Sequence, residues 1–452
     1  MLGAASLLIA RPLGYDAWAW MVWARELLHG DLQLAGGPSF KALPVIAAAP
    51  LTPFGDLAPV AWLACMRVCA LLSLLVAYRA GSRLAGAAAG GAAAVLVALG
   101  PDLYRTALYG SAEPLLVLLV LLAADRYVAG SPRTALALLG AGGLIRPELW
   151  PIVGVLALVV LLRERRLDWM VLAAALLPPV VWLGMAWAGS GRPLSQVIHA
   201  GGAQGLCAGC AAAGQWLTAV VTVNEHTTAV GVLRRLTDAI VVPAIALAAV
   251  GVIAAARRRW VEPLVIAGVA IAWILIVAVM AQAGYPGSRR YLAGSAVLLA
   301  LPAGVGFAIA VRAVHDRRGQ VALAVAIAAL VVFAAAPTLR SDAALVSTAR
   351  AEQRTASDLR LAVHRAGGRR AVLAVGRPAV NPLMQTGLAW DLDVPLTGIQ
   401  PTWHSTRRDP AWSPPAIVFR GPAHYAGPRP ALPPSRPVRP VGRAGVWTIL
   451  RA

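Results

Sequence analysis

Ionisable side chains at four places interrupt a sequence that is otherwise strongly apolar. Asp16 lies in the polar turn Gly14-Tyr15-Asp16-Ala17-Trp18, and Glu113 follows Tyr109-Gly110-Ser111-Ala112. Arg146-Pro147-Glu148 separates two short apolar runs, and Arg289-Arg290-Tyr291 follows a segment rich in glycine. Ionisable groups at membrane depth are costly and are usually retained for function. These residues therefore predict a site.

The chemistry open to such a set is displacement of a phosphate leaving group at the anomeric carbon of a sugar. A carboxylate such as Asp16 would accept the proton of the incoming hydroxyl as general base. Arginine side chains would hold the departing lipid phosphate, because the guanidinium fork matches phosphate oxygens. Carboxylates nearby would support an oxocarbenium-like transition state, as in glycosidases. We assign phosphate binding to Arg146, Arg289, Arg290 and Tyr291, and a supporting role to Glu113 and Glu148.

Each of these residues also has a structural interpretation. Asp16 is a favoured N-cap for a helix over Ala17–Leu28, and Glu113 suits the first turn of a helix. Arg146-Pro147-Glu148 could be a proline turn with a self-neutralising ion pair, and Arg289-Arg290 could contact lipid headgroups. For the last pair we favour the phosphate, because positive charge at the outer end of two spans defies the positive-inside trend.

The composition indicates an integral membrane protein. Hydrophobic residues make up 59% and charged residues 13% of the 452 residues, and the mean hydropathy is +0.70. Soluble domains carry about 25% charged residues. The 40 basic and 20 acidic residues give a net charge of +20, but Lys41 is the only lysine. Since the arginines lie mostly between apolar blocks, they indicate positive-inside topology rather than nucleic-acid binding. The Arg and Ala content suits a bacterial, actinobacterial-like source.

Apolar blocks alternate with arginine clusters in a way that predicts a polytopic helical bundle. Only helices satisfy the backbone in lipid, and a span needs roughly 20 residues. The predicted spans are Pro59–Tyr78, Leu84–Leu99, Glu113–Ala129, Thr134–Ile145, Leu149–Leu162, Trp169–Ala188, Thr237–Ala256, Val261–Ala283, Leu292–Val311 and Gln320–Pro337.

Met1–Ala10 would bring the number of spans to about eleven. It is too short to cross and lacks the features of a signal peptide. We expect a truncated first helix in preference to a re-entrant stub. This topology places the C-terminus outside, in a multi-pass protein of the cell membrane.

Two outer loops and a tail complete the domain organisation, in which residues 1–340 form the membrane domain. The first loop, residues 11–57, contains the tryptophan-rich segment Ala17–Leu28, which predicts an interfacial helix that ends at Gly30. The second loop, residues 189–231, carries Cys207 and Cys210, which are candidates for a disulfide in an oxidising compartment. A redox or metal site from one such cysteine pair has less support.

Residues 341–452 predict a small α/β domain outside the membrane. Ser341–Ala366 has the charge pattern of an exposed helix. Short β-prone runs bounded by Gly and Pro follow it at Ala371–Gly376, Ala416–Phe419 and Val446–Leu450. Gly427–Gly442 is rich in proline and predicts a loose segment. We interpret Asp391, after Trp390, as a turn residue.

Over roughly residues 1–340 the chain resembles the GT-C superfamily of polytopic glycosyltransferases, which take sugars from polyprenyl-phosphate carriers. The relatives include mannosyl-, arabinosyl- and aminoarabinose transferases. No single motif in the resemblance is individually specific. It rests on Gly14-Tyr15-Asp16 with Trp18, His29-Gly30-Asp31, Ser111-Ala112-Glu113-Pro114, Arg146-Pro147-Glu148-Leu149-Trp150-Pro151 and Arg289-Arg290-Tyr291-Leu292.

The resemblance implies an inverting hexosyl or pentosyl transferase that acts in cell-envelope glycan or glycolipid assembly. Asp16 maps onto the catalytic acidic residue of the first outer loop, and Arg290 with Tyr291 onto the pair near the carrier phosphate. Tyr15, Trp18 and Asp31 would support the site. The expected partners are a polyprenyl-phosphate-linked sugar, an acceptor glycan, lipid or protein, and the membrane, but not nucleic acid.

No cofactor is expected, although a divalent metal stays open. Many relatives carry two adjacent acidic residues in the first loop, whereas Ala17 follows Asp16 here. Hard cations need several oxygen ligands, so this departure weakens a metal site. Two other functions remain as alternatives: a transporter or flippase of lipid-linked sugars, whose intramembrane charges would line a path, and a non-catalytic scaffold of envelope assembly.

Overall fold

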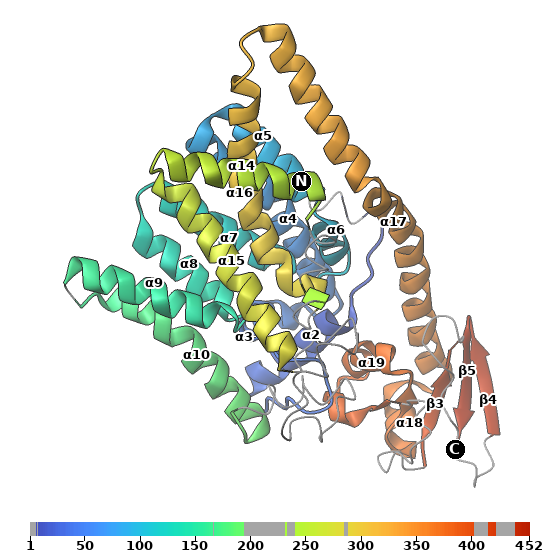
Figure 1. Cartoon of the computed structure of the whole chain (residues 1–452). Helices are drawn as coiled ribbons and strands as arrows, with labels where there is room; N and C mark the ends of the chain where they lie inside the picture. The colour runs from blue at the N-terminus through green and yellow to red at the C-terminus, as the bar shows by residue number, and fades with distance from the viewer. Residues whose placement is uncertain are drawn as a thin grey trace, which may run out of the picture.

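All ten predicted apolar blocks are helical in the computed structural model, which describes residues 6, 8–165, 167–193, 231–232, 240–283, 288–401, 415–421 and 439–452. They pack as a bundle that is extended by a small sheet near the C-terminus (Figure 1). The helices are α4 (Ala58–Ala85), α5 (Ala87–Ala98), α7 (Glu113–Val128), α8 (Pro132–Gly143), α9 (Leu149–Glu164), α10 (Trp169–Ser190), α14 (Val242–Arg257), α15 (Val261–Gln282), α16 (Ala293–Arg312) and α17 (Arg317–Arg365).

Several predictions fall on residues outside this description. They are the disulfide between Cys207 and Cys210, most of the 189–231 loop, most of Met1–Ala10 and the greater part of the proline-rich segment.

The predicted number of about eleven spans is not confirmed. In the described part of the chain, five helical segments are long and apolar enough to cross a membrane, or six if a pair bent by 57° counts as one span. Helices such as α5 and α8 have 12 residues, which is about 18 Å at 1.5 Å per residue and less than the roughly 30 Å hydrocarbon core. The five segments are Ala42–Ala85, Trp169–Ser190, Val261–Gln282, Arg289–Arg312 and Arg317–Arg365.

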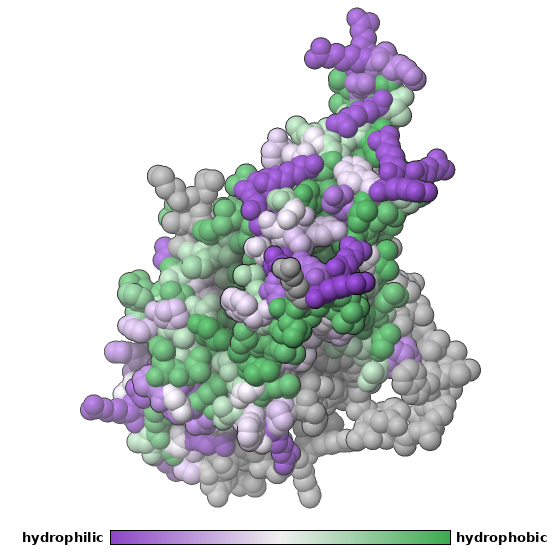
Figure 2. All heavy atoms as spheres, turned by 90° about the vertical axis from the view of Figure 1, so that its left-hand side faces the viewer, coloured by the Kyte–Doolittle hydropathy of each residue, from purple (hydrophilic) through white to green (hydrophobic). Residues whose placement is uncertain are grey.

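Apolar side chains cover the outside of the bundle. Leu158 of α9, Val180 of α10 and Leu275 of α15 are all exposed. Figure 2 shows one such face, with hydrophobic side chains over much of its middle and hydrophilic ones gathered toward its upper part. Large apolar surfaces of this kind are typical of contact with lipid.

Glycines allow the central helices to approach closely. A Cβ atom on Gly306 of α16 would lie 1.9 Å from the carbonyl oxygen of Leu247 in α14, and one on Gly81 of α4 would lie 2.9 Å from the Cα of Gly90 in α5. Small residues at helix contacts are typical of membrane bundles, in which packing takes over from the hydrophobic effect.

The first outer loop folds into α2 (Tyr15–His29), α3 (Ala42–Ala48) and the 3-10 helix η1 (Ala49–Leu57). Gly30 ends α2 in the left-handed conformation at φ 75°, as predicted. The interpretation of Asp16 as an N-cap is wrong, because Gly14 occupies that position and Asp16 lies in the first turn. Trp20 and Trp23 are completely buried. Helix α2 is therefore enclosed by protein rather than laid open to lipid.

A single helix joins the membrane bundle to the C-terminal domain. Helix α17 has 49 residues and continues through Pro337 and through residue 340, where we placed the domain boundary. Its upper part stands away from the other helices, and its lower part reaches the C-terminal domain (Figure 1). The predicted membrane helix and the predicted charged helix are thus one element.

The C-terminal domain contains a five-stranded mixed sheet with strand order β2-β1-β3-β5-β4. β1 is parallel to β2 and β3, while β5 is antiparallel to β3 and β4. Two of the three predicted strands are confirmed as β3 and β5. Ala371–Gly376 is wrong, because these residues lie mainly in α18, where Val372 is buried. The elements are α18 (Gly368–Val375), β1 (Ala379–Val380), η3 (Pro382–Met384), α19 (Gln385–Asp391), η4 (Leu396–Gly398), β2 (Gln400–Pro401), β3 (Ile417–Arg420), β4 (Arg439–Ala444) and β5 (Trp447–Arg451).

Helix α2 lies against α19 and ties the two parts of the chain together. The Arg25 guanidinium donates to the carbonyl oxygen of Val394 over 2.9 Å and pairs with Asp393 over 2.8 Å. Asp391 is the last residue of α19 rather than a turn residue. The helix that carries Asp16 therefore contacts the C-terminal domain through α19 and the rest of the first outer loop through α3 and η1.

Candidate functional site

Asp16 and Arg290 form an ion pair that joins the first outer loop to the late one. Asp16 lies in the first turn of α2, and Arg290 lies in the single 3-10 turn η2 (Arg289–Leu292) that leads into α16. Nη1 of Arg290 lies 2.8 Å from Oδ2 of Asp16. The two side chains are 39% and 18% exposed, so a ligand can reach the pair.

A second, fully buried cluster lies beside this pair. Nη2 of Arg146 lies 2.7 Å from Oε1 of Glu113, and Nζ of Lys41 lies 3.4 Å from the same oxygen. Each of the three side chains is at most 4% exposed. One carboxylate oxygen thus contacts two cations. Residue-by-residue inspection of the sequence missed Lys41, although its signal is plain: it is the only lysine.

Tyr291 connects the two clusters. The guanidinium carbon of Arg146 lies 4.2 Å from the centre of the Tyr291 ring, and that of Arg290 lies 5.9 Å from it. Arg146 also donates to the carbonyl oxygen of Arg290 over 3.4 Å. A guanidinium over an aromatic face is favourable, more so when it is desolvated. The buried ring of Tyr291 therefore orients both arginines.

Arg289 has a partner of its own. Its guanidinium binds Asp102 of α6 (Pro101–Leu108), with Nε 3.1 Å from both carboxylate oxygens and Nη2 3.0 Å from Oδ1. Both residues line the cavity described below. Arg289 and Arg290, adjacent in sequence, thus reach two different carboxylates.

Glu148 is buried without a hydrogen-bond partner in the described part of the chain. It is 2% exposed, and neither carboxylate oxygen makes a hydrogen bond there. It lies directly before α9 and attracts the Arg146 guanidinium electrostatically. Arg146 thus interacts with both Glu113 and Glu148. The self-neutralising Arg–Glu turn considered from the sequence included only Glu148.

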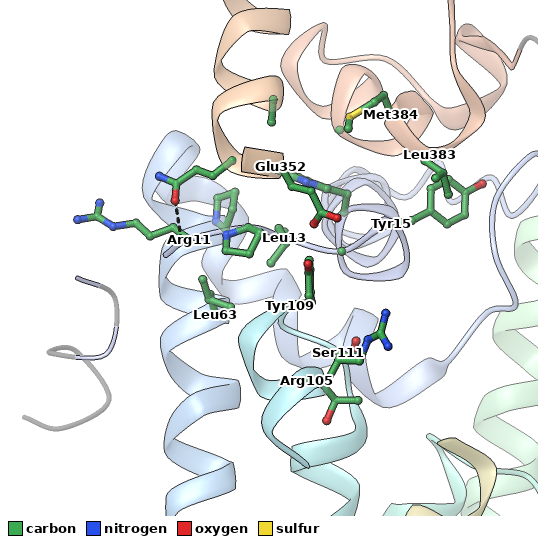
Figure 3. Close-up of a pocket in the computed structure, with 18 of the residues that line it drawn as sticks. Arg11, Leu13, Tyr15, Leu63, Arg105, Tyr109, Ser111, Glu352, Leu383 and Met384 are labelled. Carbon is green, nitrogen blue, oxygen red and sulfur yellow. Dashed lines mark hydrogen bonds between the residues drawn. The ribbon is translucent and has the colours of Figure 1, made fainter. Parts of the chain in front are cut away.

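A cavity of about 660 Å³ lies beside these clusters, and Figure 3 shows residues that line it. Glu113, Arg289 and Arg290 lie on its wall. The other walls come from the segment before α2, from α4, from α6, from α17 and from α19, so the C-terminal part of the chain supplies part of the enclosure. The residues that line it include Arg11, Leu13, Tyr15, Trp18, Leu63, Arg105, Tyr109, Ser111, Glu352, Arg360, Leu383, Met384 and Asp391.

Polar and aromatic groups alternate on the upper wall of this cavity. The Tyr15 hydroxyl donates to Oε1 of Gln385 over 3.4 Å, and burial raises the pKa of Tyr15 to about 12, so the hydroxyl keeps its proton. Arg360 pairs with Asp391 over 3.0 Å. Burial raises the pKa of Asp391 to about 6, although Arg360 opposes the shift. Trp18 lies between the Arg360 guanidinium and the Trp390 ring, at 5.9 and 6.3 Å.

Asp31 is not brought to the cluster. It lies beyond the other end of α2, which is about 22 Å long at 1.5 Å per residue. There it lines a separate cavity of about 480 Å³ together with Met185 and Ala188 of α10. The structure therefore assembles all the other predicted site residues of the described chain, but leaves Asp31 apart.

The assembled groups could bind an anion that displaces their carboxylate partners. The four cations at the site are Lys41, Arg146, Arg289 and Arg290, and each contacts a carboxylate. Within the described ranges, no group of three His, Cys, Asp or Glu side chains could hold a metal ion. A phosphate can exchange with the carboxylates for the guanidinium forks, which would release Asp16 for proton transfer.

Comparison with solved structures places the fold. No protein-family model and no curated protein matches the chain. ArnT from Cupriavidus metallidurans bound to undecaprenyl phosphate is similar over 99% of this chain and 95% of its own, with 14% identity and a TM-score of 0.56. The apo state of ArnT is similar over 99% and 96%, with 15% identity and a TM-score of 0.52. The fold expected from the resemblance to GT-C proteins is therefore confirmed, and it extends through the C-terminal domain.

Proposed function

We propose that the chain is a membrane glycosyltransferase that moves a sugar from a polyprenyl-phosphate donor to an acceptor outside the cytoplasm. The observation that carries the proposal is the Asp16–Arg290 ion pair, in which a carboxylate and a guanidinium group lie 2.8 Å apart beside the cavity. The similarity in fold to ArnT, which was solved with undecaprenyl phosphate bound, supports the same class of donor.

The reaction is a single displacement at the anomeric carbon. The acceptor hydroxyl attacks that carbon and transfers its proton to the Asp16 carboxylate, which acts as general base. The bond between the anomeric carbon and the phosphate oxygen breaks, and polyprenyl phosphate leaves with the electron pair. Arg290 moves from Asp16 to this phosphate, and Arg146, Arg289 and Lys41 add positive charge around it. One displacement inverts the anomeric configuration.

The C-terminal domain supplies the acceptor side of the cavity in this proposal. Glu352, Arg360 and Asp391 are the charged residues that the C-terminal part of the chain contributes to the cavity wall. Carboxylates and a guanidinium can bind sugar hydroxyls, and an indole such as that of Trp18 offers an apolar face to a sugar ring. We therefore propose that the acceptor carries hydroxyl groups, as an envelope glycan or glycolipid does, and that the sugar transferred is a hexose or pentose.

The proposed membrane orientation follows from the arginines. The cytoplasmic side would carry the clusters after α4, α7, α9, α14 and α16, and the cavity and the C-terminal domain would then face outward. The arginine-rich composition suits a bacterial cell envelope.

The test is transfer from a defined donor. Purified protein in lipid nanodiscs is supplied with a panel of polyprenyl-phosphate sugars labelled in the sugar, together with envelope glycolipids. The expected result is labelled acceptor with release of an equal amount of polyprenyl phosphate. Labelled donor that crosses the bilayer of a vesicle uncleaved would instead establish a flippase. If every donor in the panel binds but its sugar is neither transferred nor carried across the bilayer, the enzyme proposal is overturned in favour of a scaffold.

A further inference from the structure

Three arginines gather around one buried carboxylate at the end of the bundle opposite the candidate site. Asp125 of α7 is completely buried, and it pairs with Arg79 over 2.9 Å, with Arg83 over 2.5 Å and with Arg126 over 2.6 Å. Asp125 lies 12 residues after Glu113 in α7, about 18 Å along the helix at 1.5 Å per residue. This arginine cluster is thus separate from the cavity.

The cluster has more positive charge than its own carboxylate can balance. Three guanidinium groups against one carboxylate leave a net charge of +2. The side chains of Arg79, Arg83 and Arg126 are 51%, 37% and 30% exposed, so their outer edges face the surroundings. Within the described residues, Nη1 of Arg79 and Nη2 of Arg83 donate to no acceptor. Free donors on oriented guanidinium groups are what a phosphate oxygen requires.

The carboxylate fixes the direction of these donors. Arg79 and Arg126 each bind Asp125 with two nitrogens, a forked geometry that holds the guanidinium plane. A flexible surface arginine loses side-chain entropy when it binds a ligand, whereas here much of that loss has already occurred on folding. Asp125 therefore makes the cluster a preorganised anion site.

An apolar stripe runs along α4 up to this site. Leu71, Leu75 and Arg79 are spaced four apart and share one face of the helix, and all three are exposed. Tyr78, at the same level as Arg79, is also exposed, and exposed Tyr rings at helix ends are typical of the membrane boundary. The ligand that fits has a phosphate at one end and hydrocarbon beneath it.

We propose that Arg79, Arg83 and Arg126 bind the headgroup phosphate of an anionic membrane phospholipid, whose acyl chains lie along the exposed Leu71–Leu75 stripe of α4. The charge of +2 favours a lipid with net negative charge over a zwitterionic one. This site is independent of the proposed glycosyl transfer and lies at the opposite end of the bundle.

Arg133 is the matched control on another helix. It is 50% exposed, nearly the same as Arg79, but it binds two carboxylates, Glu164 and Asp168. This second group has a net charge of −1 and no excess of cations. Neither Arg133 nor Arg79 lines the cavity.

The test compares lipid binding by wild type, R79Q, R79K and R133Q, each as the full chain in nanodiscs of phosphatidylcholine with a minor fraction of spin-labelled phosphatidylglycerol. Wild type should enrich phosphatidylglycerol at its surface. R79Q should lower this enrichment about fivefold, the effect of one arginine near an anionic surface, and R133Q should leave it unchanged. R79K should fall between wild type and R79Q, because it keeps the charge and loses the fork.

Folding does not confound the comparison, because R79Q leaves Arg83 and Arg126 on Asp125, and the helical content is checked by circular dichroism. Equal binding of the two lipids by wild type would overturn the proposal. Equal losses in R79Q and R133Q, or full enrichment in R79K, would show a general surface potential and would also overturn it.

Discussion

Arg290 of the turn before α16 neutralises Asp16 of the turn that opens α2, over 2.8 Å and across 274 positions of sequence. The pair closes the site, because it connects the first outer loop to the last helices of the bundle. In the proposed reaction Asp16 is the general base and Arg290 binds the donor phosphate, so each is paired with the other until a donor binds. Donor binding and activation of the base would thus be one event.

The first prediction concerns Asp16 itself. D16N should reduce glycosyl transfer by at least about 100-fold, because an amide cannot accept the proton of the acceptor. The assay is sugar transfer by the full chain at equal expression. D31N is the comparison, since Asp31 lies beyond the other end of the same helix, and it should retain activity. Transfer at the wild-type rate by D16N would remove Asp16 from the mechanism.

The second prediction separates charge from shape at Arg290. R290K keeps the positive charge but loses the bidentate fork. Since a charge-assisted hydrogen bond contributes about 1.5–3 kcal/mol, the KM for donor should rise about tenfold or more. R360K makes the same change at a cavity residue from the C-terminal part of the chain and should leave the donor KM unaltered. If both variants raise it equally, Arg290 has no special role toward the donor.

The third prediction concerns the buried cluster around Glu113. E113Q leaves the buried side chains of Lys41 and Arg146 without their shared carboxylate. Loss of one partner from a buried ion pair costs about 3–5 kcal/mol, so the melting temperature should fall markedly. The double variant E113Q/K41M should recover part of the loss, since it removes one of the stranded charges. An unchanged melting temperature for E113Q would show that the cluster is solvated.

The fourth prediction concerns the acceptor wall. D391N should raise the KM for acceptor and leave that for donor unchanged, because Asp391 lines the cavity on its C-terminal side. D393N is a close control: Asp393 lies two residues later, is 51% exposed and binds Arg25 and Arg369 outside the cavity. A larger rise in the KM for acceptor from D393N than from D391N would indicate that the C-terminal domain acts only as a scaffold.

The fifth prediction is a pH dependence of stability. Burial raises the pKa of Glu26 in α2 to about 7, against 4.5 for an ordinary glutamate. Between pH 4.5 and about 7, Glu26 therefore binds more protons in the folded protein than in the unfolded chain. This group's stabilising contribution is complete below pH 4.5 and is lost as the pH rises through 7. In thermal unfolding scans, E26Q should gain in melting temperature relative to wild type as the pH rises from 5 to 8. A constant difference would contradict the raised pKa.

Much of the site could be predicted because its residues conflict with their surroundings. Glu113, Arg146 and Arg290 are expensive in an apolar chain, and only mutual pairing in one place compensates them. Lys41 follows the same logic, but in the sequence it stood out only as the single lysine and was not assigned to the site. Asp31 was included because His29-Gly30-Asp31 forms part of the family resemblance, but it lies beyond the other end of α2.

The fold was harder to predict from the sequence where short apolar runs are compatible with more than one secondary structure. Ala371–Gly376 is a short β-prone apolar run, but it lies mainly in helix α18, which contacts α17. Periodicity alone cannot distinguish a strand from a helix in so short a run. Hydropathy likewise located α5 and α8, but it carries no information on whether a 12-residue helix crosses the bilayer or ends inside it. Pro337 suggested a boundary that α17 simply passes.

The uninterrupted course of α17 sets a rotational phase between the membrane and the C-terminal domain. Each residue of an α-helix contributes a turn of about 100° and a rise of about 1.5 Å. One residue added near Pro337 would therefore swing Arg360 and α19 around the helix axis, away from α2 and the cavity wall. Seven residues would nearly restore the angle, to within about 20°, while lifting the domain by about 10 Å. Only certain lengths of α17 thus keep the C-terminal domain in its orientation, whereas a flexible loop would tolerate an insertion of any length.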